Sequence, residues 1–299
     1  MTRYWPLLLL LAAIWGASYL FIKVAVEDIE PAPMMATRAL VAGFMLATYL
    51  AFTIGGRRSL IELGRNWRPA LVLGALNAAI PFWLIAWGEK HVDSSVAGIA
   101  QSTVPIFTFV IAMRVLPHEQ VGSIRIVGVA LGFTGVIVLA GFDPRGGWWA
   151  VAGTLAVVLS SLAYASSGIY GQLRVRTVAG PVLATGSMLA GGLILLPFAL
   201  LQLPSRTPDA EAIASLLALT ILGTAFAQLV LFRMLRLFGS RRLSLVTYLI
   251  PGFAVAYGAV FLDEPVTAAA LGGLVLILGG ITLASGQRLF GTRAQEEPA

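Results

Sequence analysis

The chain has 299 residues, of which 58% are hydrophobic and 11% are charged, and its mean hydropathy is +0.88. Soluble domains carry about 25% charged residues, so this composition is typical of a membrane protein. The net charge is +6, and the sequence has no cysteine, which excludes disulfides, thiolate chemistry and Cys-ligated metals. The two histidines, His91 and His118, lie in separate polar junctions, so no histidine metal site is predicted.

The N-terminal apolar run has two interpretations. A basic residue followed by an apolar stretch is also the pattern of a cleaved signal peptide. However, Trp5 to Ile22 is 18 residues without a charge, which is longer than the apolar region of a signal peptide, and no soluble domain follows it. We therefore interpret this run as a first transmembrane helix.

Apolar runs of membrane-spanning length continue along the chain, each bounded by Pro, Gly or charged residues. A membrane β-barrel would instead show alternating segments of about ten residues. The sequence therefore predicts an all-α membrane protein with ten transmembrane helices. The runs are Pro6 to Val26, Pro33 to Ile54, Pro69 to Trp87, Ser94 to Leu116, Gly122 to Gly141, Trp148 to Gln172, Pro181 to Leu203, Ala212 to Leu235, Leu243 to Leu262 and Val266 to Gly286.

Basic residues are concentrated in every second loop. If the N-terminus is cytoplasmic, 15 of the 20 Lys and Arg residues fall in cytoplasmic segments. The exceptions are Lys23, Lys90, Arg145 and Arg206 in outer segments and Arg38 within the second run. Because Lys and Arg in short loops favour the cytoplasmic side, both termini are predicted to be cytoplasmic.

The two halves of the sequence match each other. One Glu and three Gly recur at the same spacing in 118–141 and 263–286, as Glu119, Gly128, Gly135, Gly141 and Glu264, Gly273, Gly280, Gly286. Two further matches, of Pro33 with Pro181 and of Pro105 with Pro251, keep the same order, with offsets of 145 to 148. A five-span repeat has an odd number of spans, so its second copy enters the membrane from the opposite side. We predict two inverted-topology repeats, at 1–141 and at 142–299, the second ending in a short cytoplasmic tail.

The sequence resembles the EamA family of the drug/metabolite transporter superfamily. The resemblance is carried by the ten spans, the two copies, "WGASYLFIKVA" in the first run and the Glu followed by spaced Gly in the fifth and tenth runs. The resemblance covers essentially the whole chain, and the branch of aromatic amino-acid exporters is the most similar in general character. It implies a multi-pass carrier in the cell inner membrane that exports amino acids or related metabolites through a central cavity between the repeats.

Polar side chains within the runs are candidates for the cavity, because they are costly to expose to lipid. Several share one helix face at spacings of three or four residues. Helix packing is the alternative explanation, above all for Ser and Gly. Pro105 and Pro251 would bend their helices at a substrate site or only shape the bundle. The candidate substrate-binding residues are Trp15, Ser18, Tyr19, Asn77, Trp83, Gln101, Pro105, Ser160, Tyr164, Gln228, Ser244, Tyr248 and Pro251.

Two cations near the ends of runs have alternative roles. Lys23 is expected to extend to the membrane interface. Arg38 is expected to extend outward in the same way, or to pair with an acidic residue of the first outer loop. One of them could instead bind a substrate carboxylate. Asp263 and Glu264 are interpreted as a junction in which Glu264 favours the start of the following helix and Pro265 occupies its first position.

The sequence places no Asp or Glu deep within a run and contains no P-loop, so we expect a secondary transporter and not an enzyme. Movement down the substrate gradient is the simplest mechanism, with proton exchange as the alternative. A membrane-embedded enzyme acting on a lipid-linked substrate would need converging ionisable residues, and a scaffold would leave the repeat unexplained. We expect a small-molecule substrate, a lipid bilayer around a monomer, no nucleic-acid partner and no cofactor.

Overall fold

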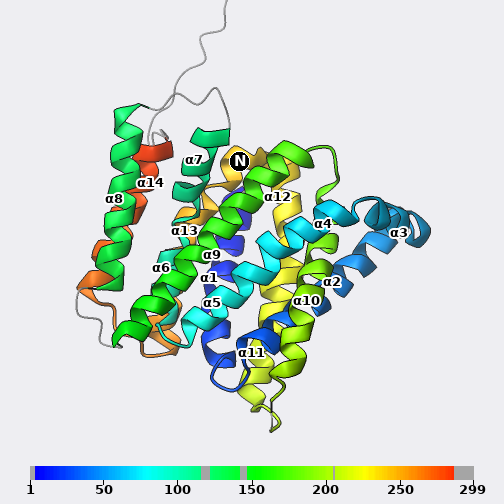
Figure 1. The fold of residues 1–299 in the computed structure, drawn as a ribbon, viewed down its shortest axis with the longest axis horizontal. Helices are drawn as coiled ribbons and strands as arrows, with labels where there is room; N and C mark the ends of the chain where they lie inside the picture. The colour runs from blue at the N-terminus through cyan, green and yellow to red at the C-terminus, as the bar shows by residue number, and fades with distance from the viewer. Residues whose placement is uncertain (1–3, 116–121, 142–146, 205, 286–299) are drawn as a thin grey trace, which may run out of the picture.

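The computed structural model describes residues 4–115, 122–141, 147–204 and 206–285, and within these ranges the regular secondary structure is entirely helical, without a strand. Glu119, which the sequence pairs with Glu264, lies outside these ranges. Figure 1 shows the helices packed side by side in one bundle, with α1 beginning and α14 ending at the same end. The helices are α1 (Tyr4–Ala25), α2 (Pro31–Ile54), α3 (Gly56–Arg65), α4 (Trp67–Gly74), η1 (Ala75–Ala79), α5 (Ile80–Glu89), α6 (Ser94–Gln101), α7 (Val104–Val115), α8 (Ser123–Ala140), α9 (Gly147–Arg174), α10 (Gly180–Leu201), α11 (Ala210–Thr220), η2 (Ile221–Phe226), α12 (Ala227–Leu243), α13 (Val246–Phe261) and α14 (Ala268–Ser285).

Eight of the described helical segments are long and apolar enough to cross a membrane. Two further apolar helices, Val246–Phe261 and Ala268–Ala284, are shorter. Large apolar side chains cover the outside of the bundle; Phe52 and Trp148, for example, are 87% and 86% exposed. Such a surface is stable in contact with lipid and not with water. The chain is therefore a multi-pass helical membrane protein.

The glycines that recur in the two halves meet in the contact between α8 and α14. A Cβ atom added to Gly128 would lie 2.7 Å from the carbonyl oxygen of Gly280, and one added to Gly135 would lie 2.8 Å from that of Gly273. Figure 1 shows these two helices side by side at one edge of the bundle. Small residues allow membrane helices to approach closely, so this glycine pattern serves packing between the halves.

Two π-helical turns interrupt long helices at corresponding places. The first, η1, joins α4 to α5, and the second, η2, joins α11 to α12. Pro81 follows η1 and lacks the N–H that a regular α-helix would use. In η2 the hydroxyl of Thr224 donates to the carbonyl of Leu219, five residues earlier. π-Turns of this kind are frequent at functional sites.

The two paired prolines lie in different local structures. Pro105 lies in the first turn of α7, directly after a break at Ser102 and Thr103 that separates α6 from α7. Pro251 lies inside α13. The fourth predicted span is thus two helices, whereas the ninth begins only at Val246.

Ion pairs and hydrogen bonds join the loops at the end of the bundle where α1 ends and α2 begins, which we call the distal end. Lys90 pairs with Glu30 at 2.8 Å. Asp28 binds the guanidinium of Arg206 and accepts from the backbone N–H of Asp209 at 2.6 Å. The Asp209 N–H and then the Arg206 guanidinium lower the pKa of Asp28. These bonds hold the α1–α2 turn against the loops after α5 and α10.

Glu264 does not begin its own helix, in contrast to the expectation from the sequence. The helix α14 begins at Ala268, and the hydroxyl of Thr267 caps it by accepting from the N–H of Ala270 at 3.0 Å. The Glu264 carboxylate instead accepts from the backbone N–H groups of Ser94 and Ser95, at the start of α6. The favourable interaction between this carboxylate and the N-terminal end of a helix therefore acts on α6, in the first half of the chain, and not on α14.

Candidate functional site

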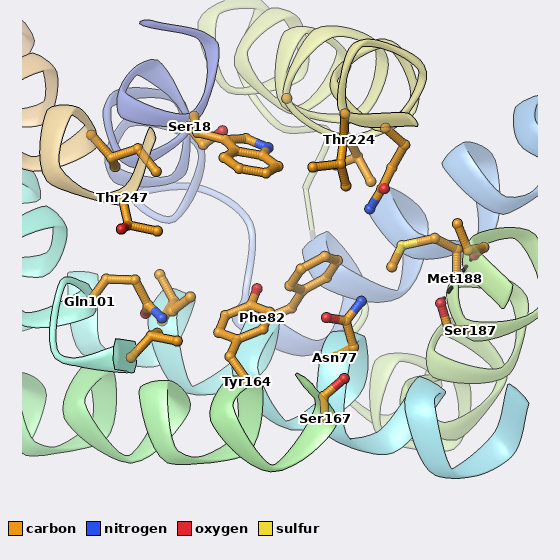
Figure 2. Close-up of a pocket in the computed structure, with 18 of the residues that line it drawn as sticks. Ser18, Asn77, Phe82, Gln101, Tyr164, Ser167, Ser187, Met188, Thr224 and Thr247 are labelled. Atoms are coloured by element: carbon orange, nitrogen blue, oxygen red, sulfur yellow. Dashed lines mark hydrogen bonds between the residues drawn. The ribbon is translucent and has the colours of Figure 1, made fainter. Parts of the chain in front are cut away.

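A cavity of about 450 Å³ lies in the middle of the bundle. Its walls come from both halves of the chain, and both π-turns contribute, through Asn77 of η1 and through Gly223 and Thr224 of η2. Figure 2 shows Asn77, Phe82 and Tyr164 on one side and Ser18 and Thr224 on the other, with their side chains directed towards the space between them. Its volume falls within the range of sites for small molecules.

Eight of the residues singled out in the sequence line this cavity. They come from separate runs, and the fold brings them together around one space. They are Trp15, Ser18, Tyr19, Asn77, Gln101, Tyr164, Gln228 and Pro251.

The other five candidates lie outside the lining. Ser160 is fully buried behind it and donates to Oε1 of Gln101 at 2.7 Å. Trp83 lies in a second hollow at the distal end, near Trp87. Pro105, Ser244 and Tyr248 are absent from the lining. On α13, Thr247 and Ile250 line the cavity together with Pro251. Ser244 lies before the first residue of α13, which begins at Val246.

Arg38 lies in the site, although the sequence indicated contact with a substrate carboxylate only as an alternative role for it. Its side chain points into the bundle and lines the cavity, and the residue is only 6% exposed. The Nε–H donates to Thr224 Oγ1 at 2.8 Å, and the guanidinium carbon lies 3.9 Å from the centre of the Phe82 ring. It forms no ion pair with any carboxylate in the described part of the chain. Among the described residues no ion pair joins Arg38 to the first outer loop, in which Glu30 binds Lys90 and Asp28 binds Arg206.

Polar groups in the rest of the lining are few. Gln101 accepts from Ser160 through Oε1, while its buried amide nitrogen Nε2 has no hydrogen-bond partner. A buried donor without a partner is costly. The hydroxyl of Tyr164 points into the same space in Figure 2. The cavity therefore offers one fixed cation and a few neutral polar groups among apolar walls.

The cavity extends to one end of the bundle and is closed at the other. Its lining reaches Gly180, an exposed residue at the start of α10. Towards the distal end it stops at Ile22 and Ile85, which are 2% and 5% exposed. Beyond them the Lys23 ammonium donates to the carbonyl oxygens of Glu89 and Val92, both at 2.8 Å. Lys23 thus fastens α1 to the end of α5 and to the loop that follows it.

Glu89 is a feature of this region that the sequence did not predict. The third run was expected to end at Trp87, but the helical segment extends to Glu89 and the carboxyl group is completely buried. Glu89 is the last residue of this segment, so it is an acidic residue buried at the end of a span and not deep within it. Charge alone could not show this, because Glu89 stands next to the exposed Lys90 in an apparently polar junction.

Comparison with known proteins identifies the family. The model of the EamA-like transporter family matches residues 3–141 and 151–286. The chain therefore belongs to the EamA-like transporter family, within the drug/metabolite transporter superfamily, which confirms the resemblance seen in the sequence.

Relatives include an uncharacterized transporter of Archaeoglobus fulgidus, 25% identical over 93% of this chain and 97% of that protein. The uncharacterized inner membrane transporter YedA of Escherichia coli is 30% identical over 61% of this chain and 57% of its own length. The protein PecM of Dickeya dadantii is 26% identical over 95% of this chain and 93% of its own length. A crystal structure with 21% identity superposes with a TM-score of 0.64 over 93% of this chain and 96% of its own, which supports the fold.

Proposed function

We propose that this transporter exports small metabolites bearing a carboxylate, most simply aromatic or other neutral amino acids, across the cell inner membrane. The observation that carries the proposal is Arg38, a buried cation with no carboxylate partner among the described residues, on the wall of a cavity whose other lining residues are apolar, aromatic or neutral polar. Buried charges in proteins are normally paired. A substrate carboxylate would supply the missing partner.

The remaining lining suits the rest of such a substrate. Phe82 and Tyr164 offer aromatic surface next to Arg38, and the unpartnered amide nitrogen of Gln101 offers a donor. An apolar side chain would be removed from water against these walls. A phosphorylated substrate fits less well, because Arg38 is the only cation in the described lining.

Alternating access between two inverted repeats is the proposed mechanism. The repeated sequence motifs, the matching π-turns and the glycine contacts between α8 and α14 support this division into five-helix units. With both termini in the cytoplasm, as the basic loops predict, the cavity is open to the cytoplasm and closed at the distal end. This is the state in which an exporter accepts its substrate.

An enzyme acting on lipid-linked substrates is less well supported. Such an enzyme would need ionisable groups that converge on one point. No three His, Asp or Glu side chains gather as a potential metal site among the described residues, and the cavity lining contains no carboxylate. The family membership also favours transport.

Ligand stabilisation of the purified protein tests the proposal. We expect phenylalanine, tryptophan or leucine to raise the melting temperature, since a ligand that binds the folded state stabilises it. Phenylalaninamide, which lacks the carboxylate, should stabilise much less than phenylalanine. In Arg38→Gln this difference should disappear, whereas in Arg58→Gln, on the exposed face of α3, it should persist. Equal stabilisation by acid and amide in the native protein would contradict the role of Arg38.

A further inference from the structure

Glu89, the last residue of α5, carries a buried carboxyl group without a hydrogen-bond partner. The residue is 0% exposed, and neither Oε1 nor Oε2 is hydrogen-bonded. The ammonium of Lys23 donates to the backbone oxygen of Glu89 and not to its carboxyl group. The group is therefore out of contact with bulk water, and no protein donor stabilises a negative charge on it.

The charged neighbours of Glu89 are engaged elsewhere. Lys23 is held by two carbonyl oxygens, Arg38 by Thr224 and the Phe82 ring, and Glu264 by the start of α6. An ionised carboxylate buried without hydrogen bonds is strongly unfavourable, even when a cation lies at some distance. The titratable groups that act on Glu89 or on these neighbours are Lys23 and Tyr19 of α1, Arg38 of α2, Tyr164 of α9, Asp93 before α6 and Glu264 before α14.

We propose that Glu89 is a proton-binding site that takes up a proton when the distal end closes and releases it to water when that end opens. The existence of an open distal end rests on the proposed transport function. In the closed state the carboxyl group is buried and neutral. In the open state it would be hydrated and, like an ordinary glutamate, ionised at neutral pH.

A dependence of the conformation on pH follows. The closed state holds one proton more than the open state, so a low pH favours closing and a high pH favours opening. One proton changes the ratio of the two states by at most about tenfold per pH unit. Because the group faces the distal side, the pH of that compartment would set how readily the transporter opens there.

Cysteine labelling measures the opening without any substrate. The chain has no cysteine, so Ala25→Cys and Ala97→Cys, each made separately, would place a single thiol at a residue that is 0% exposed near the distal end. Each would be labelled with a maleimide at a series of pH values, with and without Glu89→Gln. At each pH, the labelling rate of the single-cysteine protein with Glu89 intact is divided by the rate of the same protein carrying Glu89→Gln. This ratio removes the intrinsic pH dependence of the thiol.

We expect this ratio to rise by up to about tenfold per pH unit towards alkaline pH. The intact Glu89 loses its proton and the distal end opens, whereas glutamine stays neutral and keeps that end closed. Glu62→Gln, on the surface helix α3, should give a ratio that does not change with pH. A constant ratio for Glu89→Gln would overturn the proposal. Absence of solute transport would contradict the proposed function and leave this labelling result unaffected.

Infrared spectroscopy of the unsubstituted protein is a second test, which holds even if a change at Glu89 impairs folding. With ¹³C-labelled glutamate, the carbonyl band of a protonated carboxylic acid should persist at pH 7, where exposed glutamates are ionised. The band should decrease as the pH is raised. A spectrum with only carboxylate bands at pH 7 would show that Glu89 carries no proton.

Discussion

The carboxylate of Glu264 accepts a hydrogen bond from the backbone N–H of Ser94 at 2.7 Å. Its second oxygen accepts from the N–H of Ser95 at 3.0 Å. The first N–H groups of a helix have no partner within the helix, so a residue of the second half of the chain satisfies the start of α6 in the first half. This contact links the two halves at the closed end of the cavity.

Removal of this cap should destabilise the closed end. Truncation of a helix cap costs about 0.5–2 kcal/mol, so we expect Glu264→Ala to lower the free energy of unfolding by that amount. Glu264→Gln, which keeps one acceptor, should cost less. Denaturant unfolding in detergent measures the difference. The control is Asp263→Asn, because Asp263 has a φ of 53° that asparagine tolerates; an equal loss in this control would argue against the cap.

The glycine contact between α8 and α14 makes a second prediction. A side chain at Gly135 would collide with the backbone of Gly273 and Ile277, at 2.8 and 2.9 Å. Overpacking typically costs about 1–3 kcal/mol, so Gly135→Val should lower stability by this amount. Gly272→Val is the matched control, since its Cβ would lie 3.7 Å from Val138. Similar melting temperatures for the two variants would contradict the packing role.

Asp28 should make stability dependent on pH. Its folded-state pKa is lowered, so its contribution is present above the ordinary aspartate pKa of about 3.9 and is lost as the pH falls through the lower, folded value. The difference in melting temperature between the native protein and Asp28→Asn should therefore be largest near neutral pH and shrink below about pH 4. A difference that stays constant from pH 7 to pH 3 would show that the charge of Asp28 does not contribute.

Gln101 should bind the substrate through its free amide nitrogen. A neutral hydrogen bond contributes about 0.5–1.5 kcal/mol, so Gln101→Leu should weaken ligand binding by about two- to tenfold. Titration of a stabilising amino acid, followed by melting temperature, gives the affinity. Gln202→Leu, at the end of α10 and outside the cavity, should leave the affinity unchanged. An unchanged affinity in Gln101→Leu would remove this residue from the site.

The sequence predicted the class of fold because a membrane requires long apolar helices, and each such helix can be recognised from its own stretch of sequence. It also predicted eight of the residues that line the cavity, since polar side chains within apolar runs are costly unless they face an interior space. Helix ends were less predictable. Ser244 was expected within the ninth helix but lies before its first residue, and Thr247 lines the cavity where Tyr248 was expected.

The charged residues were the hardest to predict. Arg38, Lys23 and Glu89 all lie near the ends of apolar runs, where extension to the membrane surface is the usual expectation. Their actual positions depend on partners more than 60 residues away, such as Thr224 for Arg38 and Val92 for Lys23. The π-turns that bring Asn77 and Thr224 to the cavity likewise have no reliable signal in the sequence.

Solute flux into proteoliposomes tests the central claim most directly. We expect the purified protein to give saturable uptake of at least one radiolabelled aromatic or aliphatic amino acid, accelerated by the same amino acid inside the vesicles. Loss of a charged hydrogen bond costs about 1.5–3 kcal/mol, so folded Arg38→Gln should lower this flux about tenfold or more at limiting substrate. A folded native protein that gives no more uptake of any such amino acid than protein-free vesicles would contradict the account.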